Sequence, residues 1–147
     1  MNNQLRRAAA IAQIQGDQTH PALRGTVRFY PHPHGTWIET DIIGLPESRS
    51  GFFGFHIHEG SDCSGVGFSA TGGHFDDNKH PHPQHAGDLP PLLSASGTAQ
   101  TSVLTNRFRI PDIIGKTVVI HSDPDDFTTQ PSGKSGIKIA CGMIRRV

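Results

Sequence analysis

The chain has 147 residues, the usual size of one domain, and a chain of this length buries enough surface to form a core without added cross-links. Thirteen basic residues balance thirteen acidic ones, which argues against a nucleic-acid-binding or a polybasic membrane-binding surface. No apolar run approaches the ~18 residues that a membrane span needs, and no signal-peptide core is evident near the N-terminus. We therefore expect a single domain over residues 1–147, located in the cytoplasm or exported after removal of a signal peptide. The unusual feature is the content of ten histidines.

Short apolar runs separated by glycine and proline predict an all-β domain. In residues 24–30, Val27 and Phe29 lie on one face of the expected strand, and polar side chains lie on the other. Residues 37–42 show the same alternation. The two segments are expected to form a hairpin through a turn at residues 34–35.

Further strands are expected at 52–58, 101–110, 116–121 and 137–147. The last of these places one set of side chains on a common face: Ile137, Ile139, Cys141 and Met143. The composition of residues 7–15 suits a helix as well as a strand, and we predict a strand there.

Two long segments, residues 59–92 and 122–136, show no hydrophobic period. Glycine, serine, aspartate, histidine and proline dominate the first, and the second has the same character. Because connections in compact domains are usually much shorter, loops of this length are typically functional or disordered. Their polar residues are suited to binding a ligand.

Two histidines lie two positions apart in the predicted strand at 52–58. The period of two in a strand puts His56 and His58 on one face and Phe55 and Ile57 on the other. Imidazole suits copper and zinc, so the pair is a candidate chelator. Two solvent-facing histidines on an exposed sheet face would show the same spacing, and the pair alone does not decide between these.

A second cluster holds four histidines and three aspartates within residues 74–88. His82, His85 and Asp88 supply three ligands within one short loop. His74 completes a set of four, which is typical of a structural zinc site. The alternative is a histidine-rich, solvated loop.

Four segments and the positions of the two cysteines carry a family resemblance: GFHIHE at 54–59, GGHF at 72–75, HAGDLP at 85–90 and ACG at 140–142. Together they resemble copper-zinc superoxide dismutase, over residues 8 to 144. The sequence of residues 128–133 resembles that of the bacterial members of the family. The resemblance implies a flattened, eight-stranded Greek-key barrel, an immunoglobulin-like sandwich with two long functional loops.

The resemblance also implies two metal sites that share one histidine. The implied copper ligands are His56, His58, His74 and His121. The implied zinc ligands are His74, His82, His85 and Asp88. By itself, a histidine at a strand end such as His121 is more often a capping or surface residue. The family spacing of eight residues from His74 selects His82 as the zinc ligand, which leaves His80 as a spare.

Further residues take roles only through the resemblance. Asp125 would link a zinc histidine to a copper histidine, whereas Asp123 and Asp126 are neighbours in what is otherwise a solvated acidic turn. Two lone cysteines in an intracellular chain are normally reduced. The resemblance nevertheless implies a disulfide between Cys63 and Cys141, which would pin the loop that walls the metal site.

One position departs from the family pattern. Lys138 stands where the family has an arginine that attracts and orients the anionic substrate. Lysine keeps the positive charge but lacks the planar, two-pronged donor of arginine, so we expect activity that is reduced but not abolished. A surface lysine on a strand is the alternative.

The function that the resemblance implies is an enzyme, a copper-zinc superoxide dismutase. It would convert superoxide to dioxygen and hydrogen peroxide by alternating reduction and oxidation of a copper ion that is bridged to zinc through His74, in antioxidant defence. The expected partner is superoxide, as a small-molecule substrate. We expect binding to neither nucleic acid nor a membrane, and a homodimer is consistent with the resemblance. Two other classes compete: a metal-binding or copper-buffering protein on the same scaffold, and a structural β-sandwich module whose histidines are incidental.

Overall fold

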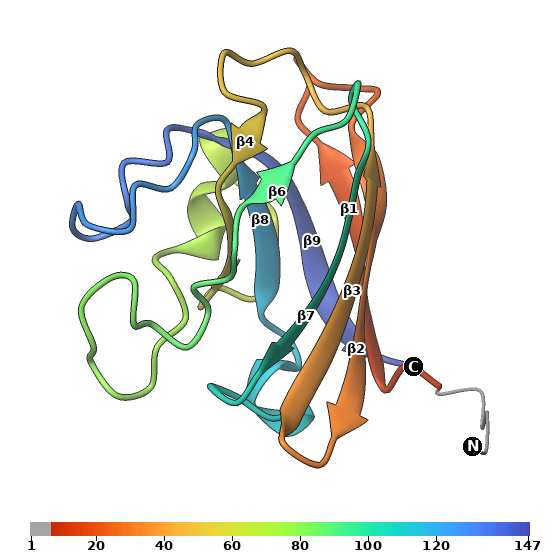
Figure 1. Ribbon diagram of the computed structural model, residues 1–147, viewed down its shortest axis with the longest axis vertical. Coiled ribbons are helices and arrows are strands. Elements are labelled where there is room, and N and C mark those ends of the chain that lie inside the picture. The colour runs from red at the N-terminus through yellow and green to blue at the C-terminus, as the bar shows by residue number, and fades with distance from the viewer. Residues whose placement is uncertain (1–6) are drawn as a thin grey trace.

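A computed structural model describes residues 7–147 (Figure 1). The first six residues, at the start of the segment considered above as a signal peptide, lie outside the described part. In chain order the elements are β1 (Ala10–Gly16), β2 (Arg24–His32), β3 (Gly35–Ile43), β4 (Phe52–Phe53), β5 (Phe55–His58), the 3-10 helix η1 (Val66–Thr71), β6 (Leu92–Leu93), β7 (Ala99–Thr105), α1 (Ile110–Ile113), β8 (Thr117–His121) and β9 (Lys138–Arg146). The strand expected over residues 7–15 is therefore confirmed as β1.

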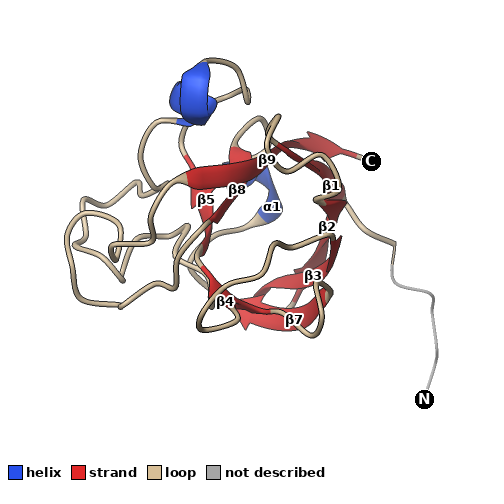
Figure 2. Ribbon diagram, turned by 90° about the horizontal axis from the view of Figure 1, so that it is seen from above, coloured by secondary structure: helices blue, strands red, loops and turns tan. Residues whose placement is uncertain are grey.

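Seven strands form one antiparallel sheet in the order β5-β8-β9-β1-β2-β3-β7, and β4 pairs with β6 in a second, small sheet. Figure 2 shows the strands curled around a common interior. The small sheet closes the barrel, because β6 lies beside β7 and β4 leads directly into β5. From β3 the chain crosses to the far edge at β5, returns to β7 beside β3, and crosses again to β8 beside β5. These crossings are Greek-key connections.

The nine labelled strands follow eight extended runs, because β4 and β5 are one run interrupted at Gly54. The main chain of Gly54 turns toward the second long loop: its N–H donates to the carbonyl of Asp123 at 2.9 Å. A Cβ atom at this position would lie 2.8 Å from the side chain of Ser135. The eight-stranded Greek-key barrel predicted from the sequence is confirmed.

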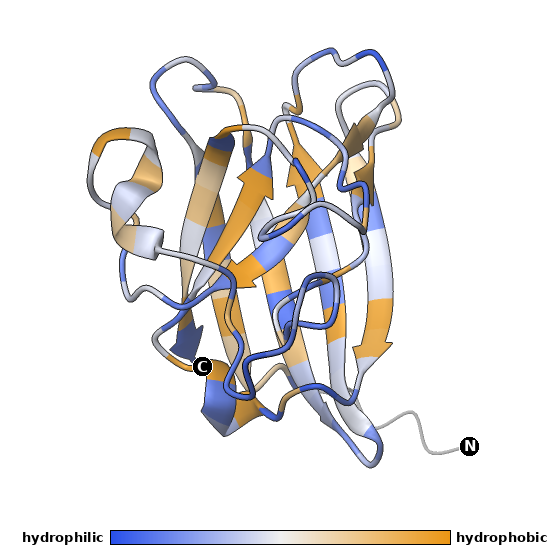
Figure 3. Cartoon of the chain, turned by 90° about the vertical axis from the view of Figure 1, so that its left-hand side faces the viewer, coloured by the Kyte–Doolittle hydropathy of each residue, from blue (hydrophilic) through white to orange (hydrophobic). Residues whose placement is uncertain are grey.

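The predicted hairpin of β2 and β3 is confirmed, with Phe29 opposite Ile38 and a turn before Gly35. Val27, Phe29, Ile38 and Ile42 are at most 1% exposed and belong to the core. Figure 3 shows hydrophobic and hydrophilic bands mixed along the strands, while the loops on this side are mostly hydrophilic. Each fully buried large side chain contributes about 1.5–3 kcal/mol to folding, so the alternation determines which face of each strand turns inward.

Two strand predictions need correction. The strand expected over 101–110 ends at Thr105, and the chain then forms the short helix α1. The helix begins just before a proline, and the carboxylate of Asp112 accepts the N–H of Arg109 at 2.8 Å, so both residues favour a helix start. Its buried side chains, Ile110 and Ile113, enter the core of the barrel.

In the last strand, the expected common face is not kept. Ile137 precedes β9 and is 67% exposed, whereas Ile139 and Ala140 are both fully buried. The cause is a β-bulge, a shift of register between β8 and β9 at Ile120/His121. No helix within residues 7–147 is long and apolar enough to cross a membrane.

Candidate metal centre

The first long loop returns to the barrel along the free edge of β5. Ile57 uses its main chain on both sides: its N–H donates to the carbonyl of Gly87 at 2.9 Å, and its carbonyl accepts the N–H of Phe75 at 2.8 Å. Backbone pairing thus sets the register and the direction of the loop relative to β5. This pairing includes isolated bridges of His56 with Asp88 and of His58 with His74. These contacts pair the loop with β5 in the way that a neighbouring strand would.

Four histidines meet beside the β5–β8 pair, three of them from these two strands and one from the first long loop. One nitrogen from each of four rings lies within 4.8 Å of the others, in a group made of His56, His58, His74 and His121. His58 and His121 come from strands that pair with each other, and their Nε2 atoms are 3.1 Å apart. Their side chains are buried, so the group sits inside the protein and not on an exposed sheet face. The solvent-facing alternative for His56 and His58 is therefore wrong.

A second group lies beside the first and shares one member. It consists of His74, His82, His85 and Asp88, again with donor atoms within 4.8 Å of one another. The carboxylate of Asp88 is the centre of this group: Oδ1 is 2.7 Å from Nδ1 of His74, and Oδ2 is 3.1 Å from Nδ1 of both His82 and His85. His74 belongs to both groups, so its ring joins the two sites.

The chemistry of these donors fits metal ions. Within residues 7–147, five buried histidine nitrogens have no hydrogen-bond partner: His56 Nδ1, His74 Nε2, His82 Nδ1, His85 Nδ1 and His121 Nδ1. A buried polar atom without a partner is costly, and native proteins leave few of them. Burial also lowers the pKa of His58 to about 2 and that of His121 to about 3. Both rings are therefore neutral at neutral pH, which is the form of imidazole that binds copper or zinc.

Asp125 connects the two groups from the second long loop. Its two carboxylate oxygens each accept a histidine N–H at 2.8 Å, Oδ2 from Nε2 of His56 and Oδ1 from Nε2 of His82. Burial alone would raise the pKa of this carboxyl, but the hydrogen bonds from the two histidines outweigh it and hold the pKa well below its usual value. Its neighbour Asp126 instead accepts main-chain N–H groups of Thr128 and Thr129.

The histidine expected to be spare lies apart from both groups. The side chain of His80 is 45% exposed, and its Nδ1 is 3.2 Å from Oδ1 of Asp76. His82, two residues further on, is buried among the donors of the second group. In a strand, residues two positions apart lie on the same face, so strand alternation cannot explain why His82 is buried and His80 is exposed. The turn geometry of the loop determines the difference.

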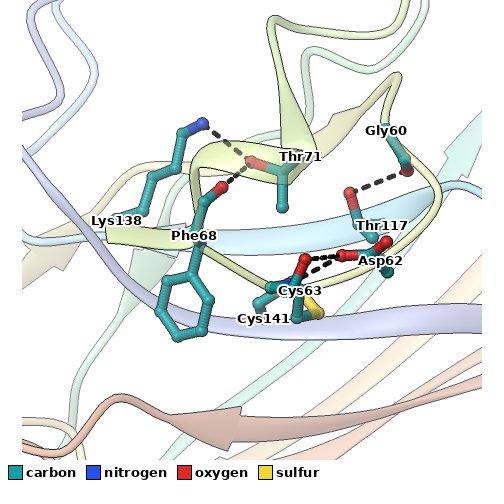
Figure 4. Close-up of a disulfide and its surroundings, with 9 residues drawn as sticks. Gly60, Asp62, Cys63, Phe68, Thr71, Thr117, Lys138 and Cys141 are labelled. Atoms are coloured by element: carbon teal, nitrogen blue, oxygen red, sulfur yellow. Dashed lines mark hydrogen bonds between the residues drawn. A yellow bond between two sulfur atoms is a disulfide. The ribbon is translucent and has the colours of Figure 1, made fainter. Parts of the chain in front are cut away.

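Lys138 points from the start of β9 toward the first long loop (Figure 4). Its Nζ donates to Oγ1 of Thr71 at 2.7 Å and to the carbonyl of Gly72 at 2.9 Å. The same carbonyl lies 2.9 Å from Nδ1 of His58, so Lys138 and a donor histidine share one partner. Burial lowers the pKa of Lys138 from its ordinary value. Thr71 was missed in the sequence, since the contact joins residues 67 positions apart and no local pattern marks it.

The predicted disulfide is confirmed between Cys63 and Cys141, with Cα atoms 5.9 Å apart and a sequence separation of 78 residues. Figure 4 shows it below the segment that carries Phe68 and Thr71. The hydroxyl of Thr71 donates to the carbonyl of Phe68 at 2.8 Å. The disulfide therefore ties β9 to the loop whose Thr71 and Gly72 accept hydrogen bonds from Lys138.

Fold and site together define a class of protein: an all-β barrel with two adjacent groups of side chains that could hold metal ions and that share an imidazole ring. The family model described as Copper/zinc superoxide dismutase (SODC) matches residues 23–144. "Superoxide dismutase [Cu-Zn]" of Deinococcus radiodurans is 34% identical and covers 89% of this chain and 81% of its own length. The protein of the same name from Legionella pneumophila is 37% identical, covering 85% and 80%. This chain belongs to the copper/zinc superoxide dismutase family.

Solved structures agree with this assignment. A SOD-like protein from Bacillus subtilis has a TM-score of 0.77 at 28% identity, and the match covers 90% of this chain and 96% of that one. A double mutant of a SOD-like protein from the same organism has a TM-score of 0.76. The family, the fold and the cofactors copper and zinc, all expected from the sequence, are thereby confirmed.

We predict that Gly87→Ala weakens the attachment of the loop to β5. A Cβ atom at Gly87 would lie 2.2 Å from the carbonyl oxygen of Ile57, so the two segments must separate. We expect a loss of about 1–3 kcal/mol in the free energy of unfolding and a lower metal content per chain. Gly73→Ala is the matched control, because its added Cβ would meet nothing closer than 3.9 Å. Equal effects of the two substitutions in denaturant unfolding would contradict the prediction.

We also predict that Cys63→Ser is less stable than the wild-type protein with its disulfide formed. Opening a loop of 78 residues removes a constraint on the unfolded chain that is worth roughly 4–5 kcal/mol in the chain-entropy model. Urea unfolding with and without a thiol reductant measures it. The reductant should lower the midpoint of the wild type and leave that of Cys63→Ser unchanged; a shift in both proteins would mean that the reductant acts elsewhere.

Proposed function

We propose that this protein is an enzyme that dismutates superoxide to dioxygen and hydrogen peroxide. The observation that carries the proposal is the pair of buried donor groups joined by the ring of His74. Copper supplies the one-electron redox change of this chemistry, whereas zinc has no accessible second redox state. The two sites are thus suited to different tasks, one redox and one structural.

The donor sets indicate which metal each group would hold. Four imidazoles suit copper, and three imidazoles with a carboxylate form a closed set typical of structural zinc. We assign copper to His56, His58, His74 and His121. We assign zinc to His74, His82, His85 and Asp88.

Each of the connecting residues has a task that follows from its contacts. His74 presents Nδ1 to Asp88 and leaves Nε2 without a protein partner among the described residues, so its ring is placed to hold or release a proton at Nε2. Asp125 holds the rings of His56 and His82 in one orientation through their Nε2 atoms. Such carboxylate partners determine the tautomer of a ligand histidine and make it a stronger donor.

Lys138 supplies positive charge beside the histidine group. Superoxide is a monoanion, so a cation at this place attracts it and orients it toward the site. Lys138 is held by Thr71 and Gly72, which replaces part of the geometric control that a forked arginine side chain would exert. We propose that it acts in substrate attraction.

His121→Ala should abolish most superoxide consumption by metal-loaded protein. The substitution removes a direct ligand, so we expect a loss beyond the ~10–100-fold typical of residues that only support a ligand. Copper content per chain should fall in parallel. His80→Ala is the control, because His80 is exposed and lies outside both groups.

Three outcomes separate the proposed enzyme from its rivals. If metal-loaded wild type consumes superoxide no faster than His121→Ala, the enzyme proposal is wrong. Stoichiometric copper and zinc with little turnover, and no gain from Lys138→Arg, would favour a copper-buffering protein. Protein isolated without added metal that lacks both ions would favour a structural module.

Lys138→Gln should slow the reaction and reduce its dependence on ionic strength. Exposed charges are screened over about 8–10 Å at physiological salt, and one steering charge contributes at the lower end of the ~10–10³ range for whole-protein fields. We expect a decrease of about tenfold or less at low salt, which shrinks as salt is added. Arg145→Gln, at the other end of β9, removes the same charge far from the site. If both variants show the wild-type salt slope, Lys138 does not steer the substrate.

Two expectations stay predictions. The homodimer that the family allows would be tested by analytical ultracentrifugation of the metal-loaded protein. The cytoplasmic location would be tested by fractionation of the cells that express it, with the exported form as the other outcome.

A further inference from the structure

The segment that carries two of the proposed zinc ligands has little regular structure of its own. We call residues 82–85 the zinc-ligand turn. The N–H of Gln84 donates to the carbonyl of Pro81, the residue just before the turn, at 2.8 Å. His82 and His85 must nevertheless both keep Nδ1 at 3.1 Å from Asp88. Something outside the turn has to hold its main chain in place.

Gln130, in the second long loop, holds the turn from one side. Its Oε1 accepts the N–H of His82 at 2.8 Å, and its Nε2 donates to the carbonyl of His82 at 2.7 Å. The side-chain amide therefore satisfies both main-chain groups of a proposed ligand, in the manner of a strand neighbour. This gives a physical role to the segment 128–133, whose sequence resembles that of the bacterial family members.

The shape of that segment suits the contact. Gly133 has φ +73°, and its N–H donates to the carbonyl of Thr129 at 2.7 Å, so the chain folds back around Gln130. A Cβ atom at Gly133 would lie 2.0 Å from Oδ1 of Asp125 and 2.6 Å from Nε2 of His82. Glycine thus leaves room for the Asp125–His82 hydrogen bond while Gln130 grips the backbone of His82.

Arg107 holds the turn from the barrel. It lies between β7 and α1, and its Nη1 donates to the carbonyls of Pro83 at 2.7 Å and His85 at 3.1 Å. The same arginine borders a cleft that is also lined by Asp88 and Asp125. The main chain from His82 to His85 is therefore bonded at three residues, His82, Pro83 and His85, by two side chains that are 23 residues apart in the sequence.

We propose that Gln130 and Arg107 are positioning residues that lock the zinc-ligand turn and thereby set how long zinc stays bound. The inference rests on the proposed zinc site. Neither residue supplies a metal donor; each fixes main-chain groups on which the direction of the His82 and His85 rings depends. The lock also couples zinc retention to the second long loop, which carries both Gln130 and Asp125.

The test is the rate at which zinc passes from copper- and zinc-loaded protein to a chromogenic zinc chelator in excess. Gln130→Ala and Arg107→Gln should each accelerate zinc release roughly 10–100-fold, the range found when partners of metal ligands are lost. Gln130→Glu keeps the acceptor for the His82 N–H but loses the donor, so its release rate should lie between those of wild type and Gln130→Ala. Arg107→Lys should restore part of the retention.

The chain offers a matched control. Arg109, two residues from Arg107, also donates from Nη1 to two carbonyls, those of His32 at 3.0 Å and Gly35 at 3.3 Å, at the β2–β3 turn. Arg109→Gln should lower the thermal unfolding midpoint and leave the zinc release rate at its wild-type value.

The outcomes distinguish the inference from the assignment beneath it. One zinc per wild-type chain that is lost in His85→Ala, together with wild-type release rates in Gln130→Ala and Arg107→Gln, would overturn the lock and leave the zinc site standing. Accelerated release in Arg109→Gln equal to that in Arg107→Gln would also overturn it, because general destabilisation would then explain the effect. A wild-type protein that binds no zinc would overturn both.

Discussion

The burial of histidine rings with unpartnered nitrogens is the constraint on which the rest of the structure depends. Burial lowers the pKa of His56, His58 and His121, and five nitrogens of the clustered histidines have no hydrogen-bond partner within residues 7–147. Such an arrangement is costly in an empty protein and favourable around metal ions, whose binding energy then becomes folding energy. The barrel and its two loops can be understood as the scaffold that holds these rings together.

The barrel fixes the donor histidines that lie on its strands. His56 and His58 are placed by β5, and His121 by β8, with positions defined by strand pairing. The remaining donors come from a loop, yet main-chain bonds to Ile57 give that loop the register of a neighbouring strand. Side chains then complete the attachment, through Asp125, Gln130 and Arg107. Precise sites are easier to maintain on strands than on loops, and this protein extends the strand-like order into the loop.

Lys138 shows how a departure from the family pattern is accommodated. A lysine has one point of charge and several rotatable bonds, so by itself it would be poorly oriented. The hydroxyl of Thr71 and the carbonyl of Gly72 restrict it, and the disulfide ties β9, the strand that carries Lys138, to the same loop. The position of the charge is thus a property of the loop and the disulfide together.

Much of this protein is determined by the sequence alone. Alternation in residues 24–30 and 37–42 specifies the hairpin and its buried face. The spacing of His82, His85 and Asp88, with His74, is typical of a metal site, whereas the spacing of His56 and His58 alone leaves a solvent-facing pair as an alternative. The end of β7 and the bulge at Ile120/His121 were not predictable, because they depend on how the barrel closes, whereas Pro111 and Asp112 are local signals for the start of α1.

The tertiary structure decided which distant residues meet, including pairings of His74 and Asp125 that only the family resemblance had implied. His74 lies in both donor groups, Asp125 and not Asp126 bridges two histidines, and Thr71, Arg107 and Gln130 grip partners 22 to 67 residues away. The physical reason is the range of the interactions. Periodicity and spacing act over a few residues, whereas these contacts are created by Greek-key crossings that bring separate loops together beside β5 and β8.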